Sequence, residues 1–414
     1  MRIMIIMKKY NFNWYKRKII WILNVFLSVV LFIVMPFRKK NVWVFGCWEG
    51  KRYDDNSRYL FEYVNENNKE IRCIWISRNT EVVESLSKKG YEVYTANSWK
   101  GIASMLLAGV SFYTNGMDDL SDLCWIKGSL VVCLNHGNTG IKKAAFTLDK
   151  FKKDSLVKTI KLLRDKLFNY YYYDVCITTS PMSSDLFEEL YGDHDKKKYV
   201  IAGMPRNDIL RHRELFDVKV PEIIDEACKY ILYLPTYREY KNSVIKDLME
   251  RMMDDRDIVS LFEKWNIRFL VKPHNIDETS EKLERTSQYF KFVNSQDVES
   301  TQVLMAFADC VITDYSSCGI DFAMTGKPVF IYVPDFEEYN KDNGFRDMWN
   351  SFYLEHPEYK DYEYLKNEII NYFDKNLFNS GANEWINNIY LDKNLSDSVY
   401  SQNVLEVISK KMGI

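Results

Sequence analysis

Apolar and polar positions alternate along most of the chain in two rhythms, one typical of strands and the other of helices. After residue 41, short apolar runs predict buried strands, and stretches with apolar residues three or four positions apart predict the helices between them. This alternation indicates an α/β fold with a parallel, doubly wound sheet. We expect strands at 42–45, 72–76, 92–94, 110–113, 130–134, 175–178 and 199–202, with helices at 57–64, 81–88, 99–108 and 183–190.

A second alternating set follows between residues 230 and 333, and it predicts a second domain of the same kind. Its clearest unit combines a buried strand, a helix and another apolar strand, with Gly326 ending the helix. We expect this unit as a strand at 308–313, a helix at 316–325 and a strand at 328–333.

The length of 414 residues suits two domains of ordinary size with additional segments. The charged segment 209–226 between the two sets is interpreted as a linker. Beyond residue 340 the pattern is irregular until two final helices, the last of which could pack on either domain. We expect an N-terminal segment at 1–40, a first domain at 41–210 and a second domain at 211–414, with the final helices at 363–373 and 401–411.

Residues 19–37 form an almost wholly apolar run that is just long enough to cross a bilayer as a helix. Its end lacks the small residues of a signal-peptide cleavage site, and basic residues flank both sides, so the positive-inside rule gives no orientation. We therefore predict a membrane-associated helix whose two ends stay near the cytoplasmic face. A true membrane span and a buried core helix are the alternatives.

Composition and charge narrow the function classes. The net charge of −2 provides no general field for nucleic acid, and we expect none as a partner. The eight cysteines contain no CxxC pair and mostly fall in apolar runs, so we predict a reducing compartment, no disulfide framework and no metal site. A basic region at 142–166 is either a solvated helix face or a contact for anionic lipid or a polyanionic acceptor.

Four loops at the ends of predicted strands carry polar residues that a core does not need. In open parallel sheets ligands bind outside the carboxyl ends of the strands, so two such domains facing each other would bring these loops to one cleft. Ser316 and Ser317 at a helix start either cap that helix or help to accept a phosphate. The four loops are 135–137, 235–238, 272–274 and 313–317.

These loops contain the residue types of phosphate chemistry. Arg238 and Lys272 suit a pyrophosphate, one as a bidentate fork and the other as a point charge. His136 and His274 have near-neutral reference pKa values, so either could act as a general base. A histidine at a strand end can also be purely structural, but the presence of two such histidines beside Arg and Lys favours a catalytic role.

Taken in order, the motifs resemble the CDP-glycerol glycerophosphotransferases, which build teichoic acids and related polyol-phosphate polymers. The resemblance runs from about residue 41 to residue 347, which is most of the chain after the N-terminal segment. It rests on 50–57, His136-Gly137 with Lys142-Lys143, 203–208, 235–238, 272–274, and 313–317 with Asp321 and Lys327-Pro328.

Three departures from the family pattern lie where a polyol would be held. Asn135 replaces the usual Trp, the segment 138–141 is one residue longer than usual, and 343–345 begins with Asn where the family often has Arg. They leave open whether the donor is CDP-glycerol or CDP-ribitol, and which acceptor is used.

The resemblance implies two facing Rossmann-like domains of the GT-B type, with CDP held mainly by the C-terminal one. It assigns His136 as the base for the acceptor hydroxyl, and His274 as a donor to the phosphate or the leaving group. Asp321 would approach the ribose, and no cofactor is expected. The residues implied to line the diphosphate are Arg206, Thr236, Arg238, Lys272, Ser316 and Ser317, and the acceptor-side residues are Asn135, Lys142 and Lys143.

The implied reaction is transfer of glycerol phosphate or a related polyol phosphate from the CDP-linked donor to a lipid-linked glycan or polyol-phosphate acceptor. It would take place at the cytoplasmic side of an anionic membrane, with CMP as the other product. A GT-B glycosyltransferase or epimerase acting on a nucleotide sugar is the main alternative, because fold alone does not define chemistry. A scaffold that binds nucleotide without turnover is a third reading, which the two histidines disfavour.

Overall fold

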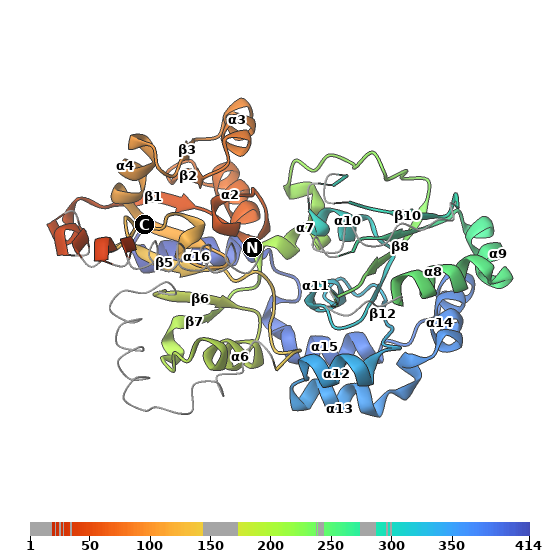
Figure 1. The fold of residues 1–414 in the computed structure, drawn as a ribbon. Helices are drawn as coiled ribbons and strands as arrows, with labels where there is room; N and C mark the ends of the chain where they lie inside the picture. The colour runs from red at the N-terminus through yellow and green to blue at the C-terminus, as the bar shows by residue number, and fades with distance from the viewer. Residues whose placement is uncertain are drawn as a thin grey trace, which may run out of the picture.

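The computed structural model describes residues 19–143 except 21, 25, 28 and 34, and then 173–236, 238, 244–273, 287–294, 297–298 and 300–414. Most of the basic region 142–166 and the whole of the loop that begins at His274 therefore lie outside the described residues. Figure 1 shows two lobes side by side, each built on one sheet.

The N-terminal lobe contains a seven-stranded parallel sheet with the order β3-β2-β1-β4-β5-β6-β7 in the described part of the chain. The strands are β1 (Lys39–Phe45), β2 (Arg72–Ser77), β3 (Val93–Thr95), β4 (Ala108–Tyr113), β5 (Leu130–Cys133), β6 (Val175–Thr178) and β7 (Tyr199–Ile201). The helices are α2 (Asp55–Asn67), α3 (Thr80–Lys88), α4 (Trp99–Leu107) and α6 (Pro181–Tyr191), and short turns include η3 (Trp48–Gly50), η4 (Met117–Asp119) and η7 (Pro205–Asn207).

The C-terminal lobe contains a five-stranded parallel sheet with the order β10-β9-β8-β11-β12, again among the described residues. Its strands are β8 (Lys229–Leu234), β9 (Ile267–Val271), β10 (Phe290–Phe292), β11 (Cys310–Thr313) and β12 (Val329–Ile331). Its helices are α7 (Asp208–Arg211), α8 (Val244–Asp254), α9 (Arg256–Trp265), α10 (Thr301–Phe307), α11 (Ser317–Ala323), α12 (Phe336–Asn343), α13 (Asp347–Glu355), α14 (Tyr362–Lys375) and α15 (Gly381–Tyr390), followed by α16 (Tyr400–Met412).

Both sheets reverse their strand order at the equivalent place, between β1 and β4 in the first and between β8 and β11 in the second. This is the topology of a doubly wound sheet, and it confirms the fold class predicted from the alternating pattern. In such folds ligands bind at this switch point, outside the carboxyl ends of the two central strands, and we use the word crevice for it. Each lobe therefore has one crevice fixed by its topology.

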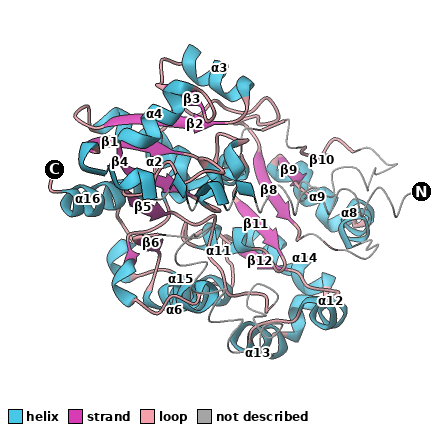
Figure 2. Ribbon diagram, turned by 60° about the vertical axis from the view of Figure 1, so that its left-hand side comes forward, coloured by secondary structure: helices cyan, strands magenta, loops and turns pink. Residues whose placement is uncertain are grey.

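Alternate residues of each strand point to opposite faces, and helices cover both faces (Figure 2). In β1, Trp43 and Phe45 pack in one cluster with residues of α2 and α16. Val42 and Val44 pack in another cluster with Met105 of α4. The strands therefore read as continuous apolar runs, because neither face meets water.

The last helix crosses back to the first lobe. Val404 and Ile408 of α16 are fully buried in the core beside β1, and Figure 1 shows this helix in blue within the N-terminal lobe. The Asp208 carboxylate accepts hydrogen bonds from the backbone N–H groups of Tyr400 and Ser401 at 2.6 and 2.7 Å, which fixes the start of the helix. Of the two packing choices left open by the sequence, α16 therefore takes the N-terminal lobe.

The apolar N-terminal segment does not form the single helix that the sequence predicts. Its described residues are helical up to residue 30, and then two short turns follow, η1 (Leu31–Ile33) and η2 (Met35–Phe37). In the described part of the chain, no helix has the length and apolar character needed to cross a membrane. Asn24 binds the backbone of Asp122 and Cys124, so this segment lies against the N-terminal lobe.

Arg38 also departs from its expected place as a basic flank of that segment. Its guanidinium donates to four backbone carbonyls, those of Met105, Ala108, Trp125 and Lys127, at 2.6 to 2.8 Å. Burial lowers the pKa of Arg38 to about 10. Arg38 therefore ties the segment to the protein instead of facing lipid.

The stretch after residue 340 is also more regular than the sequence suggests, because α12 ends and α13 lies within it. Their apolar residues are mostly aromatic, and the rings of Phe336 and Trp349 pack at tilted angles against Tyr353 instead of following a clear helical stripe. Gly344 separates the two helices with a φ of +66°.

Gly203 offers a test of how tightly α16 is held. It has a φ of +87°, and an added Cβ would overlap the ring of Tyr400. We expect Gly203→Ala to lower the free energy of unfolding by about 2–5 kcal/mol, from backbone strain and overpacking together. Gly192→Ala is the matched control, because its φ is +61° and nothing lies within 4 Å of the added methyl group. In urea unfolding, the control should lose about 1–2 kcal/mol of unfolding free energy. Equal losses in the two variants would mean that the ring of Tyr400 moves aside without cost.

Candidate active site

The C-terminal crevice is organised by Asp314, which follows β11. Its carboxylate accepts hydrogen bonds from the backbone N–H of Thr236 at 2.9 and 3.1 Å and from Nη1 of Arg238 at 2.7 Å. Because Thr236 and Arg238 follow β8, Asp314 joins the two loops that flank the point where the strand order reverses. The predicted strand-end loops 235–238 and 313–317 are thus brought together.

Arg238 is enclosed by carboxylates. In addition to Asp314, it donates through Nε to Asp335 at 2.7 Å, and its side chain is only 6% exposed. Burial opposes its charge, but Asp314 and Asp335 outweigh this effect and raise the pKa of Arg238. One guanidinium faces two carboxylates here, so in this conformation Arg238 fixes the loops and is not open to a diphosphate.

Arg206 forms a second enclosed cluster, and this one joins the lobes. Its Nη1 lies 3.1 Å from Asp55 of α2, and its Nη2 lies 2.5 Å from Asp321 of α11. The same Nη1 donates to the carbonyl of His136 at 2.7 Å. Burial opposes the charge of Arg206, but Asp321 and Asp55 raise its pKa overall.

Asp321 is fully buried, so its side chain does not reach a ribose in this conformation. It accepts hydrogen bonds from Arg206, from Nδ2 of Asn207 at 3.1 Å and from Nε2 of Gln302 at 3.3 Å. These partners come from the segment between the lobes and from α10. Asp321 is therefore a positioning residue at the contact between the lobes.

His136 is exposed between the two lobes. Its ring centroid lies 5.7 Å from that of Trp48, which follows β1 at the N-terminal crevice. The next residue, Gly137, has a φ of +123°, and a Cβ there would overlap the guanidinium of Arg206 and come within 3.4 Å of Oγ of Ser317. The loop of His136 therefore packs against the start of α11 in the opposite lobe.

Asn135, in contrast, points into the N-terminal lobe. It is 1% exposed, and its side chain donates to the carbonyl of Ile177 and accepts from the hydroxyl of Tyr191. Its own carbonyl accepts from Nδ2 of Asn56 at 2.8 Å. With a φ of +58°, Asn135 shapes the turn that presents His136, and its side chain does not face the cleft.

Lys142 and Lys143 cross from the N-terminal lobe to the other. Lys142 pairs with Phe345 as an isolated antiparallel bridge, and its ammonium lies 5.4 Å from the ring centroid of Tyr339. Burial and the nearby Arg238 lower the pKa of Lys142, while Asp314 opposes the change. Nζ of Lys143 lies 3.2 Å from the exposed Asp347.

The remaining predicted donor residues that the structure describes follow the ends of β8, β9 and β11 or begin α11. Oγ of Ser316 accepts from the N–H of Cys318, so Ser316 caps α11 as in the structural reading of the sequence. Ser317 is half-buried next to Gly137. The hydroxyl of Thr236 is buried and has no hydrogen-bond partner among the described residues. Lys272 is 7% exposed at the end of β9, and His274 lies outside the described residues.

Several residues that organise the site were not picked out individually in the sequence. Asn56 and Asp55 lie in the early motif, but only the structure shows that Asn56 binds both the turn of Asn135 and the backbone N–H of Arg206. Asp314 belongs to a quoted loop. Asp335 and Gln302 gave no signal, because an isolated acidic or amide residue has no distinctive spacing.

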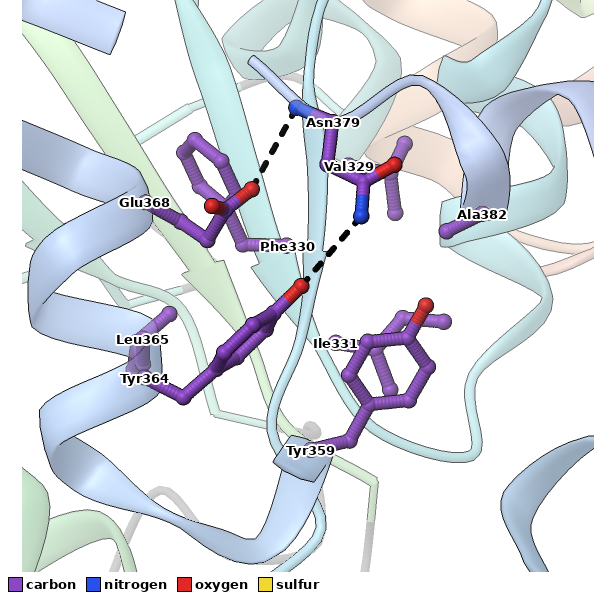
Figure 3. A pocket seen from close by; sticks show the side chains of 9 residues that line it. All are labelled: Val329, Phe330, Ile331, Tyr359, Tyr364, Leu365, Glu368, Asn379 and Ala382. Atoms are coloured by element: carbon purple, nitrogen blue, oxygen red, sulfur yellow. Dashed lines mark hydrogen bonds between the residues drawn. The ribbon is translucent and has the colours of Figure 1, made fainter. Parts of the chain in front are cut away.

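A separate small hollow lies at the edge strand β12, beneath α14 and α15. Figure 3 shows that Asn379 donates to Glu368 and to the hydroxyl of Tyr364 across its mouth. Among the described residues that line it, the only charged side chain is the carboxylate of Glu368. This hollow is thus unsuited to an anion, and it lies apart from the two crevices.

Comparisons with known proteins agree with the fold and with the ordered motifs. The sequence model of a family described as CDP-Glycerol:Poly(glycerophosphate) glycerophosphotransferase matches residues 27–410. A teichoic acid poly(glycerol phosphate) polymerase of Bacillus spizizenii is 28% identical over 352 residues, which cover 79% of this chain and 81% of that protein. A teichoic acid glycerol-phosphate transferase of Staphylococcus aureus is 24% identical over 402 residues, which cover 90% of this chain and 93% of that protein.

Among solved structures, the wall teichoic acid polymerase TagF is similar to this chain with a TM-score of 0.62 and 18% identity. The match covers 97% of this chain and 98% of that one, and it supports a shared fold of two parallel α/β lobes. Against two other teichoic acid polymerases the chain spans 43% and 41% of their length.

The Arg206 cluster predicts a large effect of a single substitution on stability. Arg206→Ala leaves Asp55 and Asp321 buried without their shared cation, so we expect unfolding free energy to fall by about 3–5 kcal/mol. Arg346→Ala is the matched control, because Arg346 also bridges the lobes, to Glu189 at 2.6 Å, but that carboxylate is 54% exposed. The control should lose less than about 1 kcal/mol in the same urea titration. Similar losses in both variants would contradict the structural role of the buried cluster.

Proposed function

The chain belongs to the CDP-glycerol:poly(glycerophosphate) glycerophosphotransferase family, and on this basis we propose that it transfers glycerol phosphate from CDP-glycerol to a hydroxyl group of a lipid-linked acceptor, in the synthesis of teichoic acid or a related capsular polymer. The observation that carries this proposal is the position of His136. Its exposed imidazole lies beside Trp48 of one lobe, while a Cβ added at the adjacent Gly137 would meet Oγ of Ser317 of the other. A reaction between ligands of the two crevices would take place at this point.

In this proposal the acceptor hydroxyl attacks the β-phosphorus of CDP-glycerol. A bond forms from the acceptor oxygen to this phosphorus, the bond to the bridging oxygen breaks, and CMP leaves with the electron pair. His136 takes the proton of the attacking hydroxyl, which is general base catalysis. His274, which follows Lys272 in the chain, donates a hydrogen bond to the phosphate or the leaving group. In such phosphoryl transfers, positioning of the reactants and stabilisation of charge supply most of the rate acceleration beyond that of the base.

The donor would occupy the C-terminal crevice, with its diphosphate near Thr236, Lys272 and Ser317. The buried hydroxyl of Thr236 has no hydrogen-bond partner among the described residues, and Lys272 brings a cation to the adjacent strand end. Arg206, Arg238 and Asp321 then act as positioning residues, since each is occupied by ion pairs. Ser316 contributes by capping the helix that presents Ser317.

The acceptor side includes Lys142 and Lys143, which connect the lobes next to the donor crevice. Asn135 contributes through the turn that presents His136. The lipid part of the acceptor would require the protein to work at an anionic membrane surface, on the cytoplasmic side. Exposed apolar residues of the N-terminal segment support this location, and they include Ile19, Ile22, Phe26, Val29, Ile33 and Phe37.

A direct test is incubation of the purified protein with a lipid-linked acceptor and, in parallel, CDP-glycerol, CDP-ribitol or a UDP-sugar, followed by mass measurement of the products. We expect growth of the acceptor by glycerol phosphate units with release of CMP.

His136→Ala should lower the single-turnover rate by about 10²–10⁴-fold and leave CDP affinity nearly unchanged, because a base acts only in the transition state. His194→Ala is the control, since His194 is exposed and pairs with Glu188 away from the cleft. Transfer only from the UDP-sugar would overturn the proposal, and normal turnover in folded His136→Ala would overturn the base assignment.

Membrane association predicts a second measurable effect. Phe26 and Ile33 are 67% and 71% exposed, and burial of each such side chain in lipid contributes about 1.5–3 kcal/mol. The double substitution Phe26→Asp with Ile33→Asp should therefore weaken sedimentation with phosphatidylglycerol vesicles by at least about tenfold. Leu377→Asp, at a 62% exposed position of the other lobe, should bind as the parent protein does. Equal binding by all three proteins would exclude this segment as the lipid contact.

A further inference from the structure

The N-terminal crevice lies between β1 and β4. The loop that enters it after β1 has an unusual backbone, because Trp48, Glu49 and Gly50 have φ values of +48°, +55° and +72° in succession. Residues other than glycine in this conformation cost about 1–3 kcal/mol each, and such strain concentrates at ligand sites. The loop is thus held in a conformation that local preference does not explain.

Asp119 holds that conformation from the loop after β4. Its carboxylate accepts from the N–H of Glu49 at 2.7 Å, and also from the N–H groups of Thr114 and Asn115, each at 2.9 Å. The carbonyl of Gly50 accepts from the N–H of Arg78 at 2.6 Å. Both sides of the crevice are therefore joined by one buried carboxylate, as Asp314 joins both sides of the other crevice.

This arrangement presents an aromatic ring, a cation and a histidine together. The guanidinium carbon of Arg52 lies 5.1 Å from the ring centroid of Trp48, whose ring is in turn 5.7 Å from that of His136. Arg52 is exposed, and the indole N–H of Trp48 is covered without a hydrogen-bond partner among the described residues. An unmatched donor of this kind costs about 1–3 kcal/mol until a ligand satisfies it.

We propose that Trp48 and Arg52 form an acceptor subsite, which binds the phosphodiester-linked polyol next to the attacking hydroxyl. The guanidinium pairs with the phosphodiester, because Arg forms charge-assisted hydrogen bonds with phosphate oxygens. The indole covers the carbon-bonded face of the polyol and offers its N–H to a hydroxyl. The neighbouring His136 then meets the terminal hydroxyl. This subsite rests on the proposed transfer reaction and specifies which end of the acceptor the N-terminal lobe recognises.

The subsite predicts a particular kinetic pattern. With glycerophosphoglycerol as soluble acceptor, Arg52→Gln and Trp48→Phe should each raise the acceptor KM by about 10–100-fold. Their kcat at saturation and their CDP affinity by calorimetry should stay near the parent values, since neither residue touches the donor crevice. With diglycerol, which lacks the phosphate, Arg52→Gln should have little effect.

Arg213→Gln is the matched control, because the guanidinium of Arg213 also lies over a ring, 4.3 Å from that of Phe307, but away from the crevices. It should leave the acceptor KM unchanged. Failure of the parent protein to transfer from CDP-glycerol would count against the proposed function itself. Active variants with an unchanged acceptor KM, or an equal effect on both acceptors for Arg52→Gln, would overturn the subsite. A lowered melting temperature with an unchanged KM would mean that the cluster only supports the fold.

Discussion

The guanidinium of Arg206 is the interaction on which the arrangement of the two lobes depends. It is shared by Asp55 from one lobe and Asp321 from the other, and it also fixes the carbonyl of His136. Removing three charges from water is expensive, so the cluster gives little net stability compared with apolar packing. Its effect is geometric, because a buried charge accepts few alternative arrangements. This contact therefore helps to fix the positions of the two crevices and of His136 relative to one another.

The two lobes use the same device to shape their crevices. In each lobe a carboxylate accepts a hydrogen bond from a backbone N–H of the neighbouring loop. Asp119 follows β4 and binds the loop after β1, and Asp314 follows β11 and binds the loop after β8. In each case, the result is a rigid mouth at the carboxyl edge of the sheet. Loops fixed in this way suit a phosphoryl transfer, whose rate depends largely on position.

The sequence predicted the structure best where a regular pattern of apolar and polar residues decides it. The alternating runs predicted both sheets, and His136 follows β5 as expected, near Trp48 and Arg206. The sequence does not show which distant residues are partners in the folded protein. Arg206 and Arg238 have the chemistry of diphosphate ligands, but carboxylates 115 and 97 positions away occupy them. From the sequence, Arg38 is one of the basic residues beside the apolar segment, but in the structure it donates to four backbone carbonyls. No local pattern encodes such contacts.

The return of α16 to the N-terminal lobe has a consequence for synthesis of the protein on the ribosome. Domains usually fold as they emerge, the first one before the second. Here, Val404 and Ile408 complete the core that Trp43 and Phe45 begin, so the first lobe keeps an open apolar face until residues 404–408 have left the exit tunnel. During that interval the nascent chain would depend on chaperones or on an early encounter with a surface that covers the face. A stop codon shortly before residue 404 would then act as a folding defect of the first lobe, because the missing residues belong to the core around Trp43 and Phe45.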